Sequence, residues 1–251
     1  MSNIFGDMSR DGLEESRDVL GGVFTFETDA YDGIIKLAYA GKAQNSNAQS
    51  VTVHVDIDGK EYRETIWITN RDGVNSYQDK KDANKRHPLP GFVTIDDICL
   101  LSTGLPLANQ TTEEKTVMLY DFEERKELPK NVHVITSILG LPITLGIQKS
   151  TEDKTKLVPG SNPPAYEPTG ETRDVNSIDK VFHTETKKTT VELRENRPQA
   201  VFYDAWKTKN QGKTRDNSTK GQGKSGAPGQ RPASSAGGGQ GKAATSLFNK
   251  N

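Results

Sequence analysis

The chain has 251 residues, and its 33 basic and 34 acidic side chains leave a formal net charge of −1. One cysteine is too few for a disulfide framework, and no stretch approaches the roughly 18 apolar residues that a membrane span requires. No apolar secretory segment begins the chain, so the sequence predicts a soluble protein of a reducing compartment with no membrane contact.

The charge is unevenly distributed along the chain. Residues 207–251 carry nine basic side chains and one acidic one, a net charge of +8, whereas residues 1–206 carry −9. The segment holds nine of the 23 glycines and contains no Val, Ile, Leu, Met or aromatic residue before Leu247. Such a composition cannot bury enough apolar surface to offset its ordering entropy, so residues 207–245 are predicted to be a disordered basic linker. Both a solubilising linker and an arm that binds nucleic acid have this composition.

The first predicted elements are a helix and a three-stranded meander. Residues 9–20 begin with capping-box spacing and predict a short helix. The pattern then changes to an alternation of apolar and polar residues, which predicts strands at 31–39, 50–57 and 61–69. Asp58-Gly59 is a typical hairpin turn between the second and third strands, so the three strands are predicted to be antiparallel neighbours.

A long segment without apolar periodicity separates the meander from the next helix. Residues 70–91 are predicted to form a loop, and a loop of this length inside a compact domain is usually functional. Residues 94–101 predict a helix with Thr94 as its N-cap and Gly104 ending it. The adjacent carboxylates Asp96-Asp97 are then expected in the first turn, where they favour the positive end of the helix dipole.

The remaining elements complete a fold prediction. They are strands at 115–122 and 142–149, a polar loop at 150–170, and mixed amphipathic pieces over 171–206 that include Ile178, Val181 and Phe182 at helical spacing. Three meander strands, a helix and two more strands match the order of a five-stranded oligonucleotide-binding (OB) barrel. We therefore predict a mainly β fold, in which residues 1–206 form one OB barrel with an inserted helix and long loops. A β-sandwich is the competing architecture, but it does not explain where the helix lies.

Trp67 is a candidate binding residue because of its position on the third strand. Ile66 and Ile68 belong to the core face of this strand, so alternation places Trp67 on the polar face beside Arg63. An indole flanked by a cation is typical of a surface on which nucleic acid bases stack, and the second and third strands are the usual ligand face of an OB barrel. The alternative is that the 70–91 loop or the C-terminal elements cover Trp67.

The 70–91 loop contributes a second group of candidates. Basic side chains neutralise phosphates, and an aromatic residue among them can stack on a base. A solvated loop of mixed charge is the alternative, because three aspartates are interspersed. The candidate residues for binding single-stranded DNA are Arg63, Trp67, Arg71, Tyr77, Lys80, Lys81, Lys85 and Arg86.

Catalysis and metal binding find little support in the sequence. None of the four histidines has a partner at metal-ligand spacing, and Cys99 is predicted to be a buried small hydrophobic residue. Asp96-Asp97 are the carboxylates on which a metal-dependent nuclease would depend, but neighbouring acids near a helix start more often complement the dipole. We expect no cofactor, no metal and no enzymatic activity.

Several short strings of the sequence resemble one protein family. The segments 1–5, 37–42, 61–66, 85–92, 100–107 and 246–248 are similar to the single-stranded DNA-binding proteins of the podoviruses grouped as Schitoviridae. This resemblance implies cooperative coating of single-stranded DNA in phage replication and recombination, in the cytoplasm of the infected bacterium. It also implies contact with the host RNA polymerase, which activates late transcription, and with phage replication proteins.

The extreme end of the chain is the segment that this resemblance assigns to the polymerase. Residues 246–251 combine an apolar pair with a cation, and the predicted partner-binding residues are Ser246, Leu247, Phe248 and Lys250. The tip is basic, whereas an acidic tip is usual in replicative single-strand binders. An RNA-binding or transcription-regulatory module that uses the same barrel face is the alternative function.

Overall fold

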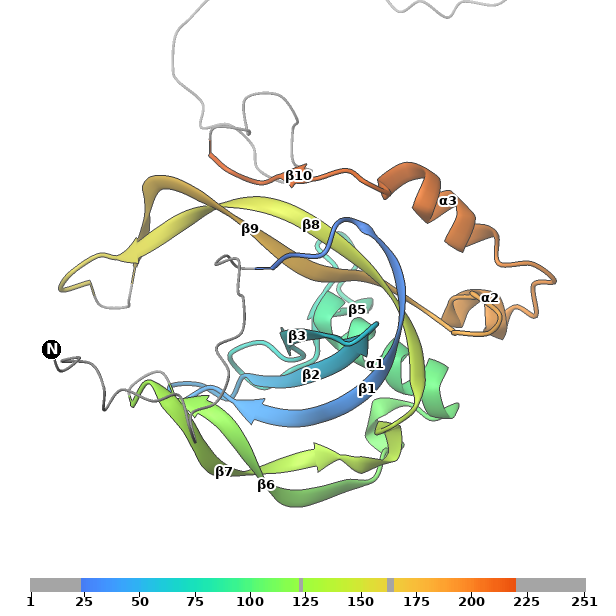
Figure 1. Cartoon of the computed structure of the whole chain (residues 1–251), viewed down its shortest axis with the longest axis horizontal. Coiled ribbons are helices and arrows are strands. Elements are labelled where there is room, and N and C mark those ends of the chain that lie inside the picture. The colour runs from blue at the N-terminus through green and yellow to red at the C-terminus, as the bar shows by residue number, and fades with distance from the viewer. Residues whose placement is uncertain (1–23, 122–123, 162–164, 220–251) are drawn as a thin grey trace, which may run out of the picture.

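The computed structural model of the chain describes residues 24–121, 124–161 and 165–219 (Figure 1). The predicted helix at 9–20, most of the predicted linker and the predicted tip at 246–251 lie outside the described residues. Within the described part, the prediction of a mainly β fold is confirmed: a large antiparallel sheet dominates, and few helices accompany it.

The predicted meander is confirmed. It consists of β1 (Asp29–Lys42), β2 (Gln49–Ile57) and β3 (Lys60–Trp67), each antiparallel to the next. Asp58 and Gly59 have φ angles of 51° and 77°, as a two-residue hairpin turn of the I′ type requires. Alternation decides the faces: the apolar residues of β2 and β3 point into the core, and the polar residues form an outer face.

The segment after the meander is more ordered than predicted. Residues 70–91 contain a small antiparallel hairpin, and a helix then begins four residues earlier than expected. The later described elements are β4 (Ser76–Gln78), β5 (Arg86–Pro88), α1 (Pro90–Thr103), β6 (Thr112–Asp121), β7 (Lys126–Ile135), β8 (Pro142–Leu157), β9 (Tyr166–Phe182), α2 (Thr190–Arg194), α3 (Val201–Asn210) and β10 (Arg215–Asp216), with short 3₁₀ turns at Leu107–Asn109 and Thr136–Ile138.

The start of α1 differs from the prediction, and its end agrees with it. Leu89 is the N-cap and Pro90 occupies the first helical turn, where a missing N–H costs nothing and the fixed φ favours the helix. Thr94 is inside the helix and donates its hydroxyl to the Pro90 carbonyl at 3.1 Å, so its predicted capping role is wrong. No acidic residue lies in the first turn, so Asp96 and Asp97 do not complement the dipole there. Gly104 ends the helix in the left-handed conformation, as predicted.

The sheet is organised around β1. Its first half pairs with β8 and its second half with β2, and Tyr39 near its end also pairs with Val134 of β7. A register shift between Ile35 and Leu37 lets the strand bend between these partners. The resulting order is β10-β8-β1-β2-β3, with β9 beside β8 and β6 beside β7 (Figure 1).

The described strands do not close into a barrel through backbone ladders. Among them, β3 pairs only with β2 and β9 only with β8, so the sheet is open between β3 and β9. One side chain bridges this gap: the Glu64 carboxylate of β3 accepts the Ile178 N–H of β9 at 2.8 Å and the Tyr62 hydroxyl at 2.7 Å. Burial raises the pKa of Glu64. The helix α1 packs against β9, β3 and β8.

Two of the later sequence predictions are corrected. The strand predicted at 115–122 is confirmed as β6, but it pairs with β7 in a hairpin instead of continuing the barrel. The predicted polar loop at 150–170 is largely the outer half of the β8–β9 hairpin, and residues 171–182 continue as strand. Both faces of that outer half are exposed, so its residues show no apolar alternation. Ion pairs across the strands, such as Lys154 to Glu171 at 3.0 Å, replace an apolar face.

The core lies between the β1–β2–β3 meander, β8, β9 and α1. Ile35, Ile143 and Leu145 are completely buried there, and Cys99 of α1 is buried among them, as predicted. Burial raises the pKa of the Cys99 thiol to about 12, so this cysteine is an inert hydrophobic residue.

The folded domain extends beyond the predicted boundary at residue 206. The helix α3 runs to Asn210, and β10 then pairs in parallel with β8, so the first part of the predicted linker, 207–219, is folded. Trp206 anchors this region: it is buried, and its indole N–H donates to Asp179 at 2.7 Å. Lys207 forms an ion pair with Asp29 at 3.1 Å. These contacts join distant parts of the chain, which is why composition alone did not predict them.

Candidate nucleic-acid interface

The outer face of the meander is built from aligned rows of residues on three strands. One row contains Gly41, Ser50 and Trp67, and the next contains Tyr39, Thr52 and Thr65. Trp67 is 51% exposed, so the described loops and C-terminal elements do not bury it.

Arg63 lies two positions from Thr65 and four from Trp67 on the same face. Its guanidinium donates to the Tyr39 hydroxyl at 3.4 Å. Tyr39 was not among the predicted site residues, although the alternation of Leu37, Tyr39 and Gly41 places it on this face. Arg63, Tyr39 and Trp67 therefore supply a cation and two aromatic rings to one surface, which we call the β3 face.

The β6–β7 hairpin limits the exposed part of this surface. Tyr39 packs with Leu119 of β6 and Val134 of β7, and Figure 1 shows the hairpin running alongside β1. Tyr39 is buried, whereas Arg63 and Trp67 on β3 are exposed. The part of the β3 face that can contact a ligand is consequently the side of β3, with Tyr39 supporting the Arg63 guanidinium.

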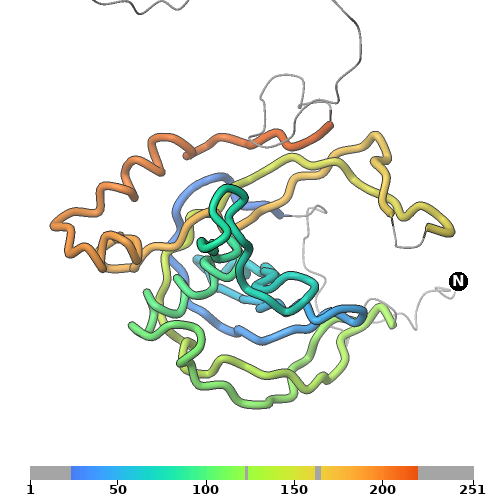
Figure 2. Tube along the Cα trace, turned by 180° about the vertical axis from the view of Figure 1, so that it is seen from behind, coloured from blue at the N-terminus to red at the C-terminus, as the bar shows by residue number. Residues whose placement is uncertain are grey.

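A second candidate surface is the β4–β5 hairpin, which Figure 2 shows on the near side of the strands when the molecule is seen from behind. Tyr77 pairs with His87, and the centroids of their rings are 5.5 Å apart. Tyr77 is 51% exposed, so one side of its ring is available to a ligand. His87 is hydrogen-bonded through Nε2 to Asp79 at 2.8 Å.

Asp79 organises the tip of this hairpin. Its carboxylate accepts the Lys81 N–H at 2.7 Å and the Asp82 N–H at 3.1 Å. The hydrogen bond from His87 and these two backbone bonds lower the pKa of Asp79. Asp79 therefore binds backbone N–H groups and His87. Asp82 instead forms an ion pair with Lys85 at 3.3 Å.

Most of the predicted phosphate-binding residues have no acidic partner among the described residues. Arg86 donates Nε to the Ser76 hydroxyl at 3.2 Å, and Lys85 has Asp82 as its partner. Within the described part of the chain, no ion pair involves Arg63, Arg71, Lys80, Lys81 or Arg86. The interspersed aspartates that the structure describes therefore form no ion pairs with these five cations.

The two surfaces are held next to each other without direct contact between their aromatic rings in the described structure. The chain leaves β3 at Trp67 and returns at Gly91, where the backbones are so close that a Cβ on Gly91 would lie 2.2 Å from the Trp67 carbonyl oxygen. The Leu89 N–H also donates to the Asn75 carbonyl at 2.8 Å, which closes the base of the hairpin. Glycine at 91 is required for this approach.

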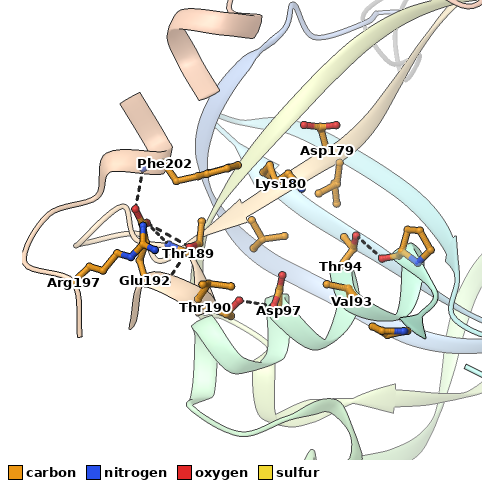
Figure 3. A pocket seen from close by; sticks show the side chains of 15 residues that line it. Val93, Thr94, Asp97, Asp179, Lys180, Thr189, Thr190, Glu192, Arg197 and Phe202 are labelled. Carbon is orange, nitrogen blue, oxygen red and sulfur yellow. Dashed lines mark hydrogen bonds between the residues drawn. The ribbon is translucent and has the colours of Figure 1, made fainter. Parts of the chain in front are cut away.

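A pocket of about 760 Å³ lies beyond the base of the same hairpin, between α1, β9, α2 and the start of α3. Figure 3 shows Phe202 and Lys180 on one side of it and Val93, Thr94 and Asp97 of α1 on the other. Asp97 accepts the Thr190 hydroxyl at 2.8 Å, and burial raises the pKa of its carboxyl. No sequence pattern predicts this pocket, because its walls come from segments that are far apart in the sequence.

The carboxylates considered for a nuclease have structural partners. Asp96 accepts the Leu107 N–H at 2.7 Å, and Asp97 is bonded to Thr190. Residues 24–121, 124–161 and 165–219 contain no group of three or more His, Cys, Asp or Glu side chains arranged to hold a metal ion. Over the same ranges no helix has the length and apolar character to cross a bilayer.

The four residues predicted to bind a protein partner, at the tip 246–251, lie outside the described residues. Comparison of the chain with protein-family models, curated proteins and solved structures found no match. The geometry and charge of the β3 face and the β4–β5 hairpin are therefore the basis for a functional assignment.

Proposed function

We propose that the protein binds single-stranded DNA in a sequence-tolerant manner, across the β3 face and the β4–β5 hairpin. The observation that carries the proposal is the half-exposed Trp67 on the same strand face as Arg63, next to a hairpin whose cations mostly lack ion pairs within the described residues. Stacking of a base on an aromatic side chain contributes about 1–3 kcal/mol and tolerates any base, because every base has a π face. The cations supply the contacts with phosphates.

The architecture supports this assignment if the sheet is compared with an OB barrel. The order β9-β8-β1-β2-β3 corresponds to the strand order of that barrel, with α1 after the third strand and β6–β7 as an insertion. We propose that Glu64, which joins β3 to β9, takes the place of the closing ladder. The β3 face then coincides with the surface on which OB barrels bind oligonucleotides.

Two features favour a single strand over a duplex. The ring of Trp67 lies on a sheet face, and bases can stack on such a surface only when they are unpaired and turned outward. Tyr77 projects from a hairpin whose tip carries Lys80 and Lys81, so a flexible strand can place a base and two phosphates there together.

The resemblance to the single-stranded DNA-binding proteins of Schitoviridae supports a wider role, which remains a proposal. In this role the protein coats DNA during phage replication and recombination in the cytoplasm of the bacterial host. The basic linker tethers the tip, residues 246–251, close to the DNA, and the tip binds the host RNA polymerase. Phage replication proteins are further proposed partners.

The decisive experiment is a titration with oligonucleotides of equal length. Single-stranded DNA should quench the tryptophan fluorescence and bind more tightly than duplex DNA or RNA, and Trp67→Ala and Tyr77→Ala should each weaken binding by about 1–3 kcal/mol. Preferential binding of RNA would favour an RNA-binding module on the same face. If neither alanine variant changes the affinity, the proposed stacking surface is wrong.

A further inference from the structure

We propose that the pocket between α1, β9, α2 and α3 binds one nucleotide of the same DNA strand, with its base against Phe202 and its phosphate at Lys180. The proposal rests on the proposed function and extends the binding path beyond the β4–β5 hairpin. It assigns a role to a concave surface that neither the β3 face nor the hairpin uses.

The walls of the pocket expose apolar side chains to solvent. Phe202 is 42% exposed, and Val93 and Val191 are also exposed although they line the same concavity. A volume of about 760 Å³ lies in the range of small-molecule sites, and it can contain a nucleotide. A planar base would bury apolar surface on these side chains and stack on the Phe202 ring.

The acidic groups around the pocket are mostly engaged by other partners. The Glu192 carboxylate accepts the Thr189 N–H at 3.0 Å and the Phe202 N–H at 2.9 Å, and Asp179 accepts the indole N–H of Trp206. Asp97 is bonded to the Thr190 hydroxyl, and burial favours its neutral form. Carboxyl and hydroxyl groups on this wall can hydrogen-bond the polar edge of a base.

Lys180 is placed to bind a phosphate. Its ammonium nitrogen lies 6.0 Å from the centroid of the Phe202 ring, and within the described residues it forms no ion pair. The β3 face likewise combines a cation and an exposed aromatic ring, since Arg63 and Trp67 lie four residues apart on the same face of one strand. Arg197, the other cation of the pocket, is paired with Glu195 at 2.6 Å.

The pocket is continuous with the proposed binding path. Pro88 of β5 lines the pocket, and Arg86 lies two residues earlier on the same strand with its side chain exposed. The strand β5 therefore carries both a cation of the proposed binding path and a residue of the pocket wall. This continuity favours a nucleotide of the bound strand over an unrelated small molecule.

The test compares matched substitutions in the full-length protein. Phe202→Leu keeps an apolar side chain but removes the aromatic face, and Val201→Leu is its control, since Val201 is exposed on the same helix and does not line the pocket. Lys180→Gln is matched by Lys209→Gln, which removes an exposed cation from α3. Affinity for an oligo(dT) is measured by fluorescence titration, and thermal melting verifies folding.

We expect Phe202→Leu to weaken binding of the oligonucleotide about fivefold or more, and Phe202→Tyr to restore it, since one base stack is worth about 1–3 kcal/mol. Lys180→Gln should weaken binding and flatten its salt dependence more than Lys209→Gln. Equal affinity of Phe202→Leu and Val201→Leu, with Trp67→Ala still impaired, would overturn the pocket proposal and leave the proposed function intact. Absence of single-strand binding by the wild type would overturn both.

A peptide of residues 246–251 is the competing occupant of the pocket. It is titrated as a labelled probe into protein that lacks these six residues. Binding of this peptide that Phe202→Leu abolishes, combined with unchanged oligonucleotide affinity in that variant, would show a peptide site and contradict the nucleotide proposal.

Discussion

Two hairpins that extend into solvent differ in how their lysines are paired. In the outer half of the β8–β9 hairpin, lysines face glutamates across the strands: Lys154 pairs with Glu171 at 3.0 Å and Lys156 with Glu167 at 3.1 Å. In the β4–β5 hairpin, Asp79 binds backbone N–H groups and His87, so it forms no ion pair with the lysines at the tip. The two hairpins therefore differ in how many of their lysines form ion pairs, and the proposed function assigns DNA binding to the hairpin with fewer pairs.

The difference has a physical origin. Cross-strand pairs on an exposed ladder stabilise the strands modestly and leave little net field for a ligand. A carboxylate that accepts backbone N–H groups is held away from its neighbouring lysines, and their ammonium groups can then attract phosphates. If this distinction decides where DNA binds, substitutions in the two hairpins should have different effects.

The largest expected effect is the loss of a stacking ring from the β3 face. Trp67→Ala should weaken binding of oligo(dT) by about 1–3 kcal/mol, roughly 5- to 150-fold. Tyr166→Ala removes a still more exposed ring from the β8–β9 hairpin and should leave the affinity unchanged. Fluorescence anisotropy of a labelled oligonucleotide measures both. Equal losses in the two variants would contradict the comparison.

The next effect concerns the lysines of the two hairpins. The double substitution Lys80→Gln and Lys81→Gln should reduce affinity and lower the slope of log affinity against log salt, by about 0.7 for each phosphate that is no longer neutralised. The same change at Lys154 and Lys156 removes two paired lysines and should leave the slope unaltered. Titrations at several salt concentrations give the slopes. A flat salt dependence in the wild type would eliminate the electrostatic contribution altogether.

A smaller effect, on the local stability of the tip of the β4–β5 hairpin, is expected from acidification. The hydrogen bond from His87 lowers the pKa of Asp79 below its ordinary value of 3.8, so the ionised carboxylate stabilises the folded tip above that value. This stabilisation is lost as the pH falls from 3.8 through the lower pKa of the folded state. The protection of the Lys81 and Asp82 backbone amides against exchange, measured by NMR relative to the unstructured chain, should fall over that interval. Asp79→Asn should remove the pH dependence of this protection, and an unchanged protection profile in this variant would contradict the role given to Asp79.

The smallest effect on DNA affinity is expected from removal of residues 246–251. This deletion takes away one basic side chain among many and should change the affinity for single strands by no more than about twofold. The same deletion should abolish recovery of RNA polymerase from host lysate by the immobilised protein. Equal recovery by the full-length and shortened proteins would place the polymerase contact on the folded domain.

Patterns of neighbouring residues predicted those structural elements that depend only on residues close together in the sequence. Alternation over residues 50–57 and 61–69, with Asp58-Gly59 between them, places two strands, their turn and the outward position of Trp67, because side chains of a strand alternate between its faces. Gly104 as a helix end follows from the same kind of reasoning, since a left-handed residue suits glycine. The burial of Cys99 was predicted from its apolar neighbours in the sequence.

Only the tertiary structure decided the features that depend on residues far apart in the sequence. The strand nature of β9 comes from its pairing with β8, because a hairpin exposed on both faces has no apolar alternation to reveal it. The folding of 207–219 depends on Thr28, Asp29 and Asp179, which a count of glycines and lysines cannot include. The pocket lined by Phe202 exists because α1, β9, α2 and the start of α3 surround it. The geometry of Asp79 likewise keeps its carboxylate on backbone N–H groups instead of the lysines at the tip. Sequence patterns report which face of an element a residue occupies, whereas the neighbour that it meets on that face is a property of the folded chain.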